Sequence, residues 1–160
     1  MYKEEGKLKV LKLLHETENL IPDNLVPNLD SLDGFPDIPQ WHQFESEIWK
    51  NGETIRQIVK ENKSFLKDNN IIEGILSIAL NRNAKRGRQS FIMLLWNKSS
   101  ARFADELVNQ LDDEFVNGHI IEGLNKMKVA DYVTQVRPFC KVKITWIRKQ
   151  ANKYINLYDR

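Results

Sequence analysis

The spacing of apolar residues constrains the fold of this chain more than any other feature of its sequence. From Gly52 almost to the end of the chain, apolar residues recur at steps of three and four, which places them on one face of an α-helix. No stretch shows the alternation of apolar and polar residues that indicates a half-buried strand. Short breaks interrupt the pattern near residues 68–70, 82–84, 97–100, 128–129 and 140–143. The sequence therefore predicts an all-α fold. Because the connections between the helices are short, neighbouring helices are expected to be antiparallel.

The pattern also predicts where the helices lie. An amphipathic helix is expected over residues 1–20, through Leu8, Val10, Leu11 and Leu14, and a short helix over residues 41–50. Seven further helices are predicted at residues 53–67, 70–81, 85–96, 101–111, 113–127, 130–137 and 144–158. Their lengths are similar, which is the usual sign of a repetitive architecture.

Prolines and acidic residues set the first part of the chain apart. Four of the five prolines fall within an 18-residue stretch, at Pro22, Pro27, Pro36 and Pro39. This density excludes a regular helix, because each ring removes a backbone donor and clashes with the preceding turn. Residues 1–50 hold 5 Lys and Arg against 10 Asp and Glu, whereas residues 51–160 hold 19 against 12. We therefore expect an N-terminal cap with a Pro-rich acidic segment over residues 1–50, and one helical repeat region over residues 51–160.

Two roles are open for residues 21–40. Their apolar side chains could belt the first helices to the rest of the protein, or the acidic segment could lie in a basic groove and block it.

Self-comparison of the chain shows a repeat of apolar positions. A shift of 29 residues aligns Ile75 with Ala104 and Val133, and a shift of 31 residues aligns Val116 with Ile147. Unrelated amphipathic helices of similar length would also align at apolar positions, so that alternative stays open. A true repeat would mean stacked helix pairs, each of which buries its apolar stripe against its neighbours.

The repeated segments resemble the HEAT-like family of α-solenoids. The resemblance covers about residues 70–158 and is carried by LDDEFVNGHIIEGLNKM (residues 111–127) and KVKITWIRKQANKYINLY (residues 141–158). The period of about 30 residues is shorter than the usual 40 or more. The resemblance implies a short right-handed α-solenoid of about three HEAT-like helix pairs, with an N-terminal helical cap. It also implies that the second helix of each pair lines a concave groove.

The helix faces opposite the predicted apolar stripes form the candidate binding site. On residues 113–127 we expect Val116, Ile120, Leu124 and Met127 in the core, and Gly118 and Asn125 on the groove face. The candidate binding residues are Arg86, Gln89, Met93, Trp96, Phe115, His119, Glu122, Trp146, Lys149 and Lys153. Aromatic and Met side chains beside Arg and Lys are typical of binding hot spots. Burial of Trp96 and Trp146 by internal packing is the alternative.

Motifs for catalysis, metals or cofactors are weak in this sequence. Each histidine precedes a glutamate by three residues, in the pairs His15/Glu18, His42/Glu45 and His119/Glu122. One helix face would hold each pair, but the pairs lie in distant segments. Cys140 has basic neighbours that could lower its pKa, although a small core residue is the commoner role. We expect no catalytic residue, no metal and no cofactor.

Composition bears on the compartment. The single cysteine excludes an internal disulfide framework, and no apolar run approaches the ~20 residues of a membrane helix. The charged N-terminus lacks the apolar core of a signal peptide. The sequence therefore predicts a cytoplasmic protein with no membrane partner.

These observations favour a non-enzymatic protein-binding module. An immunity protein or inhibitor that occludes a toxin or enzyme through its concave helical surface is one concrete form of that function. The alternative is a nucleic-acid-binding HEAT-like protein with a basic groove around Lys85, Arg86, Arg88, Lys98 and Arg102. Acidic residues are interspersed among these cations, which favours a solvated surface instead.

Overall fold

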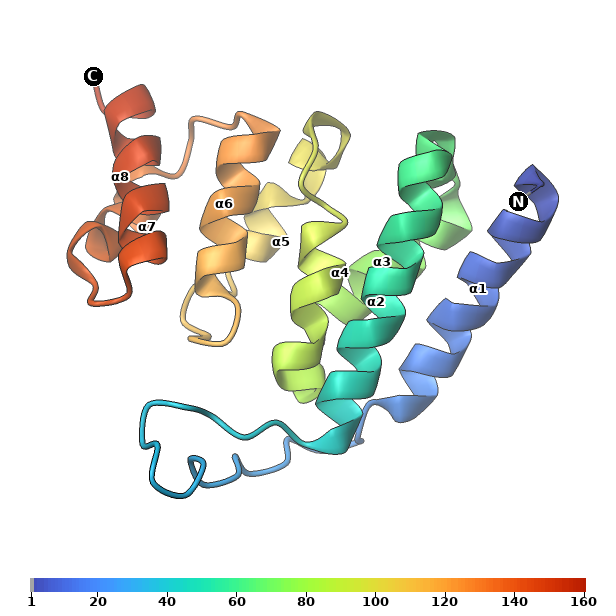
Figure 1. The fold of residues 1–160 in the computed structure, drawn as a ribbon. Helices are drawn as coiled ribbons and strands as arrows, with labels where there is room; N and C mark the ends of the chain where they lie inside the picture. The colour runs from blue at the N-terminus through green and yellow to red at the C-terminus, as the bar shows by residue number, and fades with distance from the viewer. Residues whose placement is uncertain (1) are drawn as a thin grey trace. The chain divides into compact units, whose positions relative to one another are not determined.

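The computed structural model of the protein describes residues 2–160 and is all-helical (Figure 1). In the described range it contains eight α-helices and four short 3-10 helices, and no strand. The one isolated β-bridge found there joins Leu32 and Phe35. The all-α prediction is confirmed.

The chain divides into two compact units, Met1–Phe91 and Ile92–Arg160. The boundary between them falls inside the short helix α4 (Gln89–Met93). The sequence suggested a different grouping, into residues 1–50 and 51–160, which stays a prediction.

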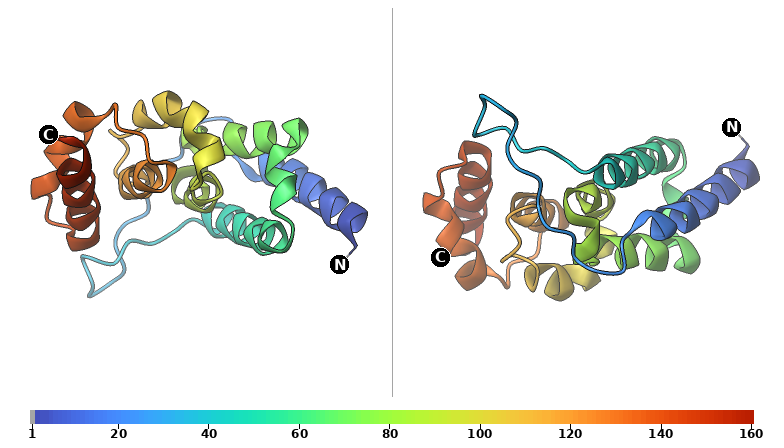
Figure 2. Two further views of the ribbon diagram at one scale, coloured as in Figure 1. Left: turned by 90° about the horizontal axis from the view of Figure 1, so that it is seen from above. Right: turned by 90° about the horizontal axis from the view of Figure 1, so that it is seen from below.

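The first unit contains three long helices and two 3-10 helices. They are α1 (Lys3–Leu20), α2 (Gln43–Glu61), η1 (Lys63–Lys67), α3 (Asn69–Ala79) and η2 (Arg82–Arg88). α1 packs against both α2 and α3, and α2 packs against η2 (Figure 2). The core is mainly aliphatic, with Val10, Ile48, Ile55, Ile71 and Ile75 fully buried. Burial of these stripes supplies the main stabilisation of the unit.

Two predictions for this unit are wrong in detail. The helices expected at residues 41–50 and 53–67 are one helix, α2, which runs through Gly52 and ends at Glu61. A Cβ at position 52 would lie 1.9 Å from Ser90 Oγ, so the glycine allows a close approach of residues 90–91 to α2. Leu8 was expected on the apolar face of the first helix, but its side chain is exposed. The buried positions of α1 include Gly6, Val10 and Leu14, one turn apart.

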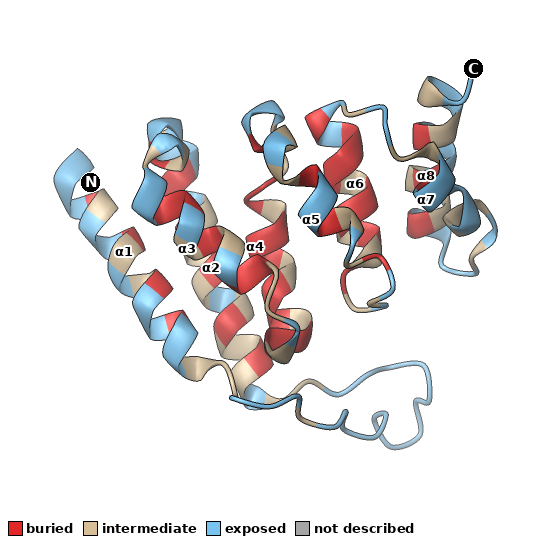
Figure 3. Ribbon diagram, turned by 180° about the vertical axis from the view of Figure 1, so that it is seen from behind, coloured by how far each residue is buried: buried red, intermediate tan, exposed pale blue. Residues whose placement is uncertain are grey.

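Residues 22–42 lie outside the helices and connect α1 to α2. Every residue from 27 to 40 is exposed, including the leucines that were expected to pack on the first helices (Figure 3). The belt role suggested for this segment therefore has no packing contact to support it at Leu25, Leu29, Leu32 or Phe35.

The second unit contains η3 (Lys98–Phe103), α5 (Ala104–Val108), α6 (Asn117–Met127), α7 (Val133–Val136), η4 (Arg137–Lys141) and α8 (Thr145–Tyr158). α6 packs against α8, α5 and η3, and α8 also packs against α7 and η4. Figure 3 shows that much of α6 is buried. Its predicted core residues, Val116, Ile120, Leu124 and Met127, are all buried, which confirms the apolar stripe.

Polar contacts define the helix ends and connections in this unit. Lys128 caps the C-terminal end of α6: its backbone is left-handed with φ 59°, and its N–H donates to the carbonyl of Leu124. The fully buried Tyr154 on α8 fixes the next connection, because its hydroxyl donates to the carbonyl of Val129 at 2.6 Å and accepts the N–H of Tyr132 at 3.1 Å. The expected helices at 101–111 and 130–137 are shorter than predicted, and each contains or adjoins a 3-10 turn.

Candidate functional site

An exposed amphipathic surface of the second unit lies on α8. Trp146, Lys149, Lys153 and Leu157 follow one another at steps of three and four residues and are all exposed. These four residues are called the α8 strip below. The opposite face of the helix, with Ile147, Ala151 and Tyr154, is buried. One side of α8 thus completes the core, and the other presents two apolar side chains beside two ammonium groups.

Trp146 is partly exposed and also well anchored. Its exposed fraction is 41%, yet a Cβ placed on Gly118 would lie 2.4 Å from its Cη2 atom. Its ring meets the His119 ring edge-on, with centroids 5.2 Å apart. Gly118 therefore lets the indole lie directly on the backbone of α6. A large side chain that is held on one side and open on the other is pre-ordered for binding.

Trp96 has a structural position in the same unit. Its indole N–H donates to the carbonyl of His119 at 2.8 Å, and its ring stacks with the His119 ring at 6.3 Å. Its Cδ1 atom would lie 3.0 Å from a Cβ on Gly123. These contacts leave Trp96 half-buried, in line with the packing alternative considered for it.

His119 lies between the two indoles. Burial lowers the pKa of His119 to about 4, because the surrounding rings replace the water that would solvate an imidazolium. The imidazole is therefore neutral near pH 7 and packs as a flat, weakly polar ring.

The other candidate residues are distributed over both units. Arg86 and Gln89 lie in the first unit, and the remaining eight lie in the second. Met93, Phe115 and Glu122 are half-buried, and the Phe115 N–H donates to Asp113 Oδ1 at 2.9 Å. Within the second unit the structure brings Trp96, His119 and Trp146 into one cluster, and it places Lys149 and Lys153 on the same helix face as Trp146.

The predicted groove face of α6 is wrong at two positions. Gly118 and Asn125 were expected to be open to a groove, but both are buried. α8 covers them, and the Asn125 amide donates to the carbonyl and to Oε1 of Gln150 at 3.0 and 2.8 Å. α6 is therefore covered on more than one side, which a single apolar stripe does not predict.

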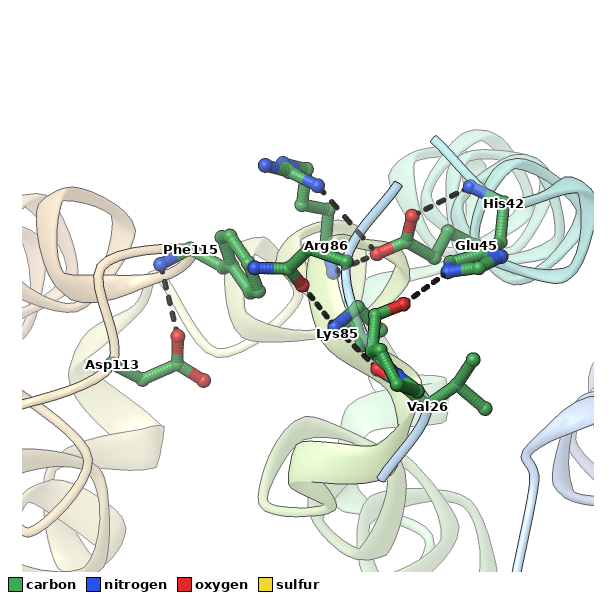
Figure 4. A network of polar contacts seen from close by, with 9 residues as sticks. Val26, His42, Glu45, Lys85, Arg86, Asp113 and Phe115 are labelled. Atoms are coloured by element: carbon green, nitrogen blue, oxygen red, sulfur yellow. Dashed lines mark hydrogen bonds and ion pairs between the residues drawn. The ribbon is translucent and has the colours of Figure 1, made fainter. Parts of the chain in front are cut away.

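Two cations of η2, Lys85 and Arg88, do not form a solvated surface. Lys85 and Arg88 are buried, and an Arg88 Nη1 donates to the carbonyl of Ala79 at 2.9 Å. The Lys85 ammonium donates to the carbonyl of Val26 at 2.9 Å and to Asn28 Oδ1 (Figure 4). Lys98 and Arg102, in the second unit, are exposed. Both earlier interpretations of this cluster, as phosphate contacts or as a solvated face, are wrong for Lys85 and Arg88.

A fully buried carboxylate organises the same region. Glu45 Oε2 accepts the N–H of His42 at 2.8 Å, and its Oε1 accepts the N–H of Arg86 at 3.2 Å (Figure 4). The guanidinium of Arg86 lies 3.9 Å from the same Oε1. The His42/Glu45 spacing, considered above for a metal, thus serves as the N-terminal cap of α2.

The remaining chemical candidates are not assembled into a site. No group of three or more His, Cys, Asp or Glu residues in residues 2–160 could hold a metal ion. Burial raises the pKa of the Cys140 thiol, and the opposing effect of Arg137 is smaller, so the lowered pKa considered for this residue does not occur. Within the same range, every helix is too short or too polar to cross a membrane.

Sequence reasoning missed one member of the exposed surface. Leu157, with an exposed fraction of 44%, continues the α8 strip one turn beyond Lys153. Its signal in the sequence is the i, i+4 spacing to Lys153.

Comparisons with known proteins do not place the chain in a family. No protein-family model, curated protein or solved structure matches it.

Proposed function

We propose that this protein is a non-enzymatic protein-binding module that contacts its partner through the α8 strip. The observation that carries the proposal is the state of Trp146, whose indole is anchored on Gly118 and still 41% exposed. Burial of such a ring in a complex removes apolar area from water at little cost in side-chain order. Tryptophan is also enriched among the residues that dominate binding energy.

The charges on the strip indicate the chemistry of the partner. Lys149 and Lys153 lie between Trp146 and Leu157 along α8, and all four are exposed. The complementary surface is therefore acidic along its middle and apolar at each end. Lysines beside apolar anchors steer encounter and set orientation more than they add affinity.

We further propose that the fold is a HEAT-like α-solenoid. Two features support it: the resemblance over residues 70–158, and the sequential packing of α5 with α6, α6 with α8 and α7 with α8. Within this class we propose an immunity protein or inhibitor, which acts by covering the working surface of a toxin or enzyme. A preformed, rigid binding face suits that role because it loses little freedom on binding.

The test is a capture experiment from native lysate with three full-length baits. They are the wild type, the strip variant Lys149→Glu/Lys153→Glu, and the control Lys60→Glu/Lys63→Glu, which makes the same charge change at exposed positions of the first unit. Matching circular dichroism spectra and melting curves verify that all three fold alike.

The wild type and the control are expected to retain one protein in stoichiometric amount, and the strip variant to retain at least about tenfold less. Equal retention of that protein by the strip variant would refute the role of α8. Recovery of nuclease-sensitive nucleic acid in place of a protein would favour the basic-groove alternative, and its binding would weaken steeply with salt.

A further inference from the structure

A second exposed apolar surface lies in the first unit, in residues 22–40, called the arm below. The arm carries four aspartates, Asp23, Asp30, Asp33 and Asp37, and no Lys, Arg or His. It also exposes five large apolar side chains: Leu25, Leu29, Leu32, Phe35 and Ile38. These are half of the large apolar side chains that the described residues expose. Contiguous exposed apolar residues in a folded chain mark an interaction surface.

The base of the arm is held by two side chains of η2 and by His42, the residue before α2. The Asn83 amide donates to the carbonyl of Pro22 at 3.0 Å, and the Lys85 ammonium donates to that of Val26 at 2.9 Å. His42 Nε2 lies 2.8 Å from the carbonyl of Pro27; because a carbonyl only accepts, this nitrogen carries the proton. Three side chains outside the arm thus fix its first residues.

The tip of the arm has its own hydrogen bonds. The Leu32 N–H donates to the carbonyl of Ile38 at 2.9 Å. The Phe35 N–H donates to the carbonyl of Leu32 at 2.8 Å, and the Ile38 N–H donates to the carbonyl of Phe35 at 2.9 Å. Gly34, with φ 77°, permits the turn between them. The tip is therefore a closed turn that leaves Phe35 with an exposed fraction of 56%.

Backbone strain marks the point where the arm is attached. Lys85 has φ 53° and ψ −129°, a conformation that is costly for a residue with a side chain, and its side chain is buried. Such conformations persist where the surroundings over-determine them, and they cluster at functional positions. Here the strained residue is the one whose ammonium holds the arm.

We propose that the arm of one copy of this protein binds the α8 strip of a second copy. The two surfaces are complementary in both charge and polarity. The aspartates of the arm match Lys149 and Lys153, and Leu32, Phe35 and Ile38 match Trp146 and Leu157. This inference rests on the binding role proposed above for the α8 strip, and it names a second copy of the chain as an occupant that competes there with the partner protein.

The stoichiometry follows from the presence of one arm and one strip on each copy. Two copies can exchange arms reciprocally and close a twofold dimer, or they can join head to tail into longer chains. The contact is small, which predicts weak, concentration-dependent association. Because charged groups contribute to it, added salt is expected to weaken it.

Sedimentation velocity of the full-length chain tests the proposal at rising protein concentration and at low and high salt. The two charge reversals are Asp33→Lys/Asp37→Lys in the arm and Lys149→Glu/Lys153→Glu in the strip, all at exposed positions. The matched control is Lys60→Glu/Lys63→Glu. Circular dichroism verifies that each variant retains the fold.

Wild type and control are expected to associate, and each reversal to weaken association at least about tenfold. An equimolar mixture of the two reversed proteins is expected to associate again, because the basic arm of one then meets the acidic strip of the other. A chain that stays monomeric under all conditions would overturn the proposal. Association that neither reversal weakens, or that the mixture does not restore, would also overturn it.

The capture experiment separates this inference from the proposed function. Suppose that the chain is monomeric in sedimentation, and that the strip variant still fails to retain the protein captured by the wild type. The binding role of α8 would then stand, and only the pairing of arm and strip would be refuted.

Discussion

Protonation of His119 offers a quantitative test of how α6 and α8 pack. The ring lies between Trp96 and Trp146, and burial lowers its pKa to about 4 from the ordinary value of 6.5. The perturbation is a fall in pH, which adds a charge to a ring that has little access to water. In the unfolded chain the same ring is solvated and protonates near its ordinary pKa.

The sign and size of the effect follow from these two pKa values. Between pH 6.5 and pH 4 the unfolded state binds more protons than the folded state, so stability falls as the pH is lowered through this range. Above pH 6.5 the contribution is constant. Below it, the loss grows to about 2 kcal/mol at pH 5 and about 3 kcal/mol at pH 4, at 1.36 kcal/mol for each pKa unit.

Urea unfolding measures this loss of unfolding free energy. Wild type and His119→Gln are compared from about pH 8 to pH 5, and far-ultraviolet circular dichroism follows the unfolding. Glutamine stays neutral throughout, and the carboxylates titrate alike in both proteins, so the difference between the two curves isolates the imidazole. We expect His119→Gln to be the less stable near pH 8, through lost ring contacts, and to lose about 2 kcal/mol less on acidification to pH 5. Parallel curves for the two proteins would refute the buried position of His119.

Three further changes test the packing of each unit. Gly118→Ala is expected to cost about 2 kcal/mol in urea unfolding, because the new Cβ would lie 2.4 Å from Trp146 Cη2; Gly74→Ala, whose Cβ meets the flexible end of a leucine, is the control. Tyr154→Phe is expected to cost about 2 kcal/mol and to speed amide hydrogen exchange near residue 132, because it deprives a buried N–H and a carbonyl of their partner. Glu45→Ala is expected to cost about 3 kcal/mol in the same unfolding assay, through loss of the α2 cap and of the carboxylate beside a guanidinium. Wild-type stability in any of these three variants would contradict the contact concerned.

The sequence was sufficient to predict the helices that have a regular apolar stripe. α3, α6 and α8 lie close to their predicted ranges, and the core of α6 is buried at every predicted position. Apolar residues spaced by three and four positions share one face of a helix, and that face is buried because it must be removed from water. It does not report how many neighbours a helix has, and so Gly118 and Asn125 were misplaced.

Contacts between distant residues account for the other differences. A glycine inside a helix costs about 1 kcal/mol relative to alanine, which favoured a break at Gly52. The structure keeps the helix intact there because the missing side chain lets residues 90–91 approach α2. Likewise, nothing near Lys85 in the sequence shows that its ammonium is paired with a carbonyl 59 residues away.

The central claim, that the α8 strip is the binding surface, is tested most directly by lysine footprinting. Acetylation rates of individual lysines, measured by mass spectrometry, are compared between the purified chain at low concentration and the complex captured from lysate. We predict that Lys149 and Lys153 react more slowly in the complex, whereas Lys60 and Lys63 react at unchanged rates. Unchanged rates at Lys149 and Lys153 in a stoichiometric complex would contradict the claim.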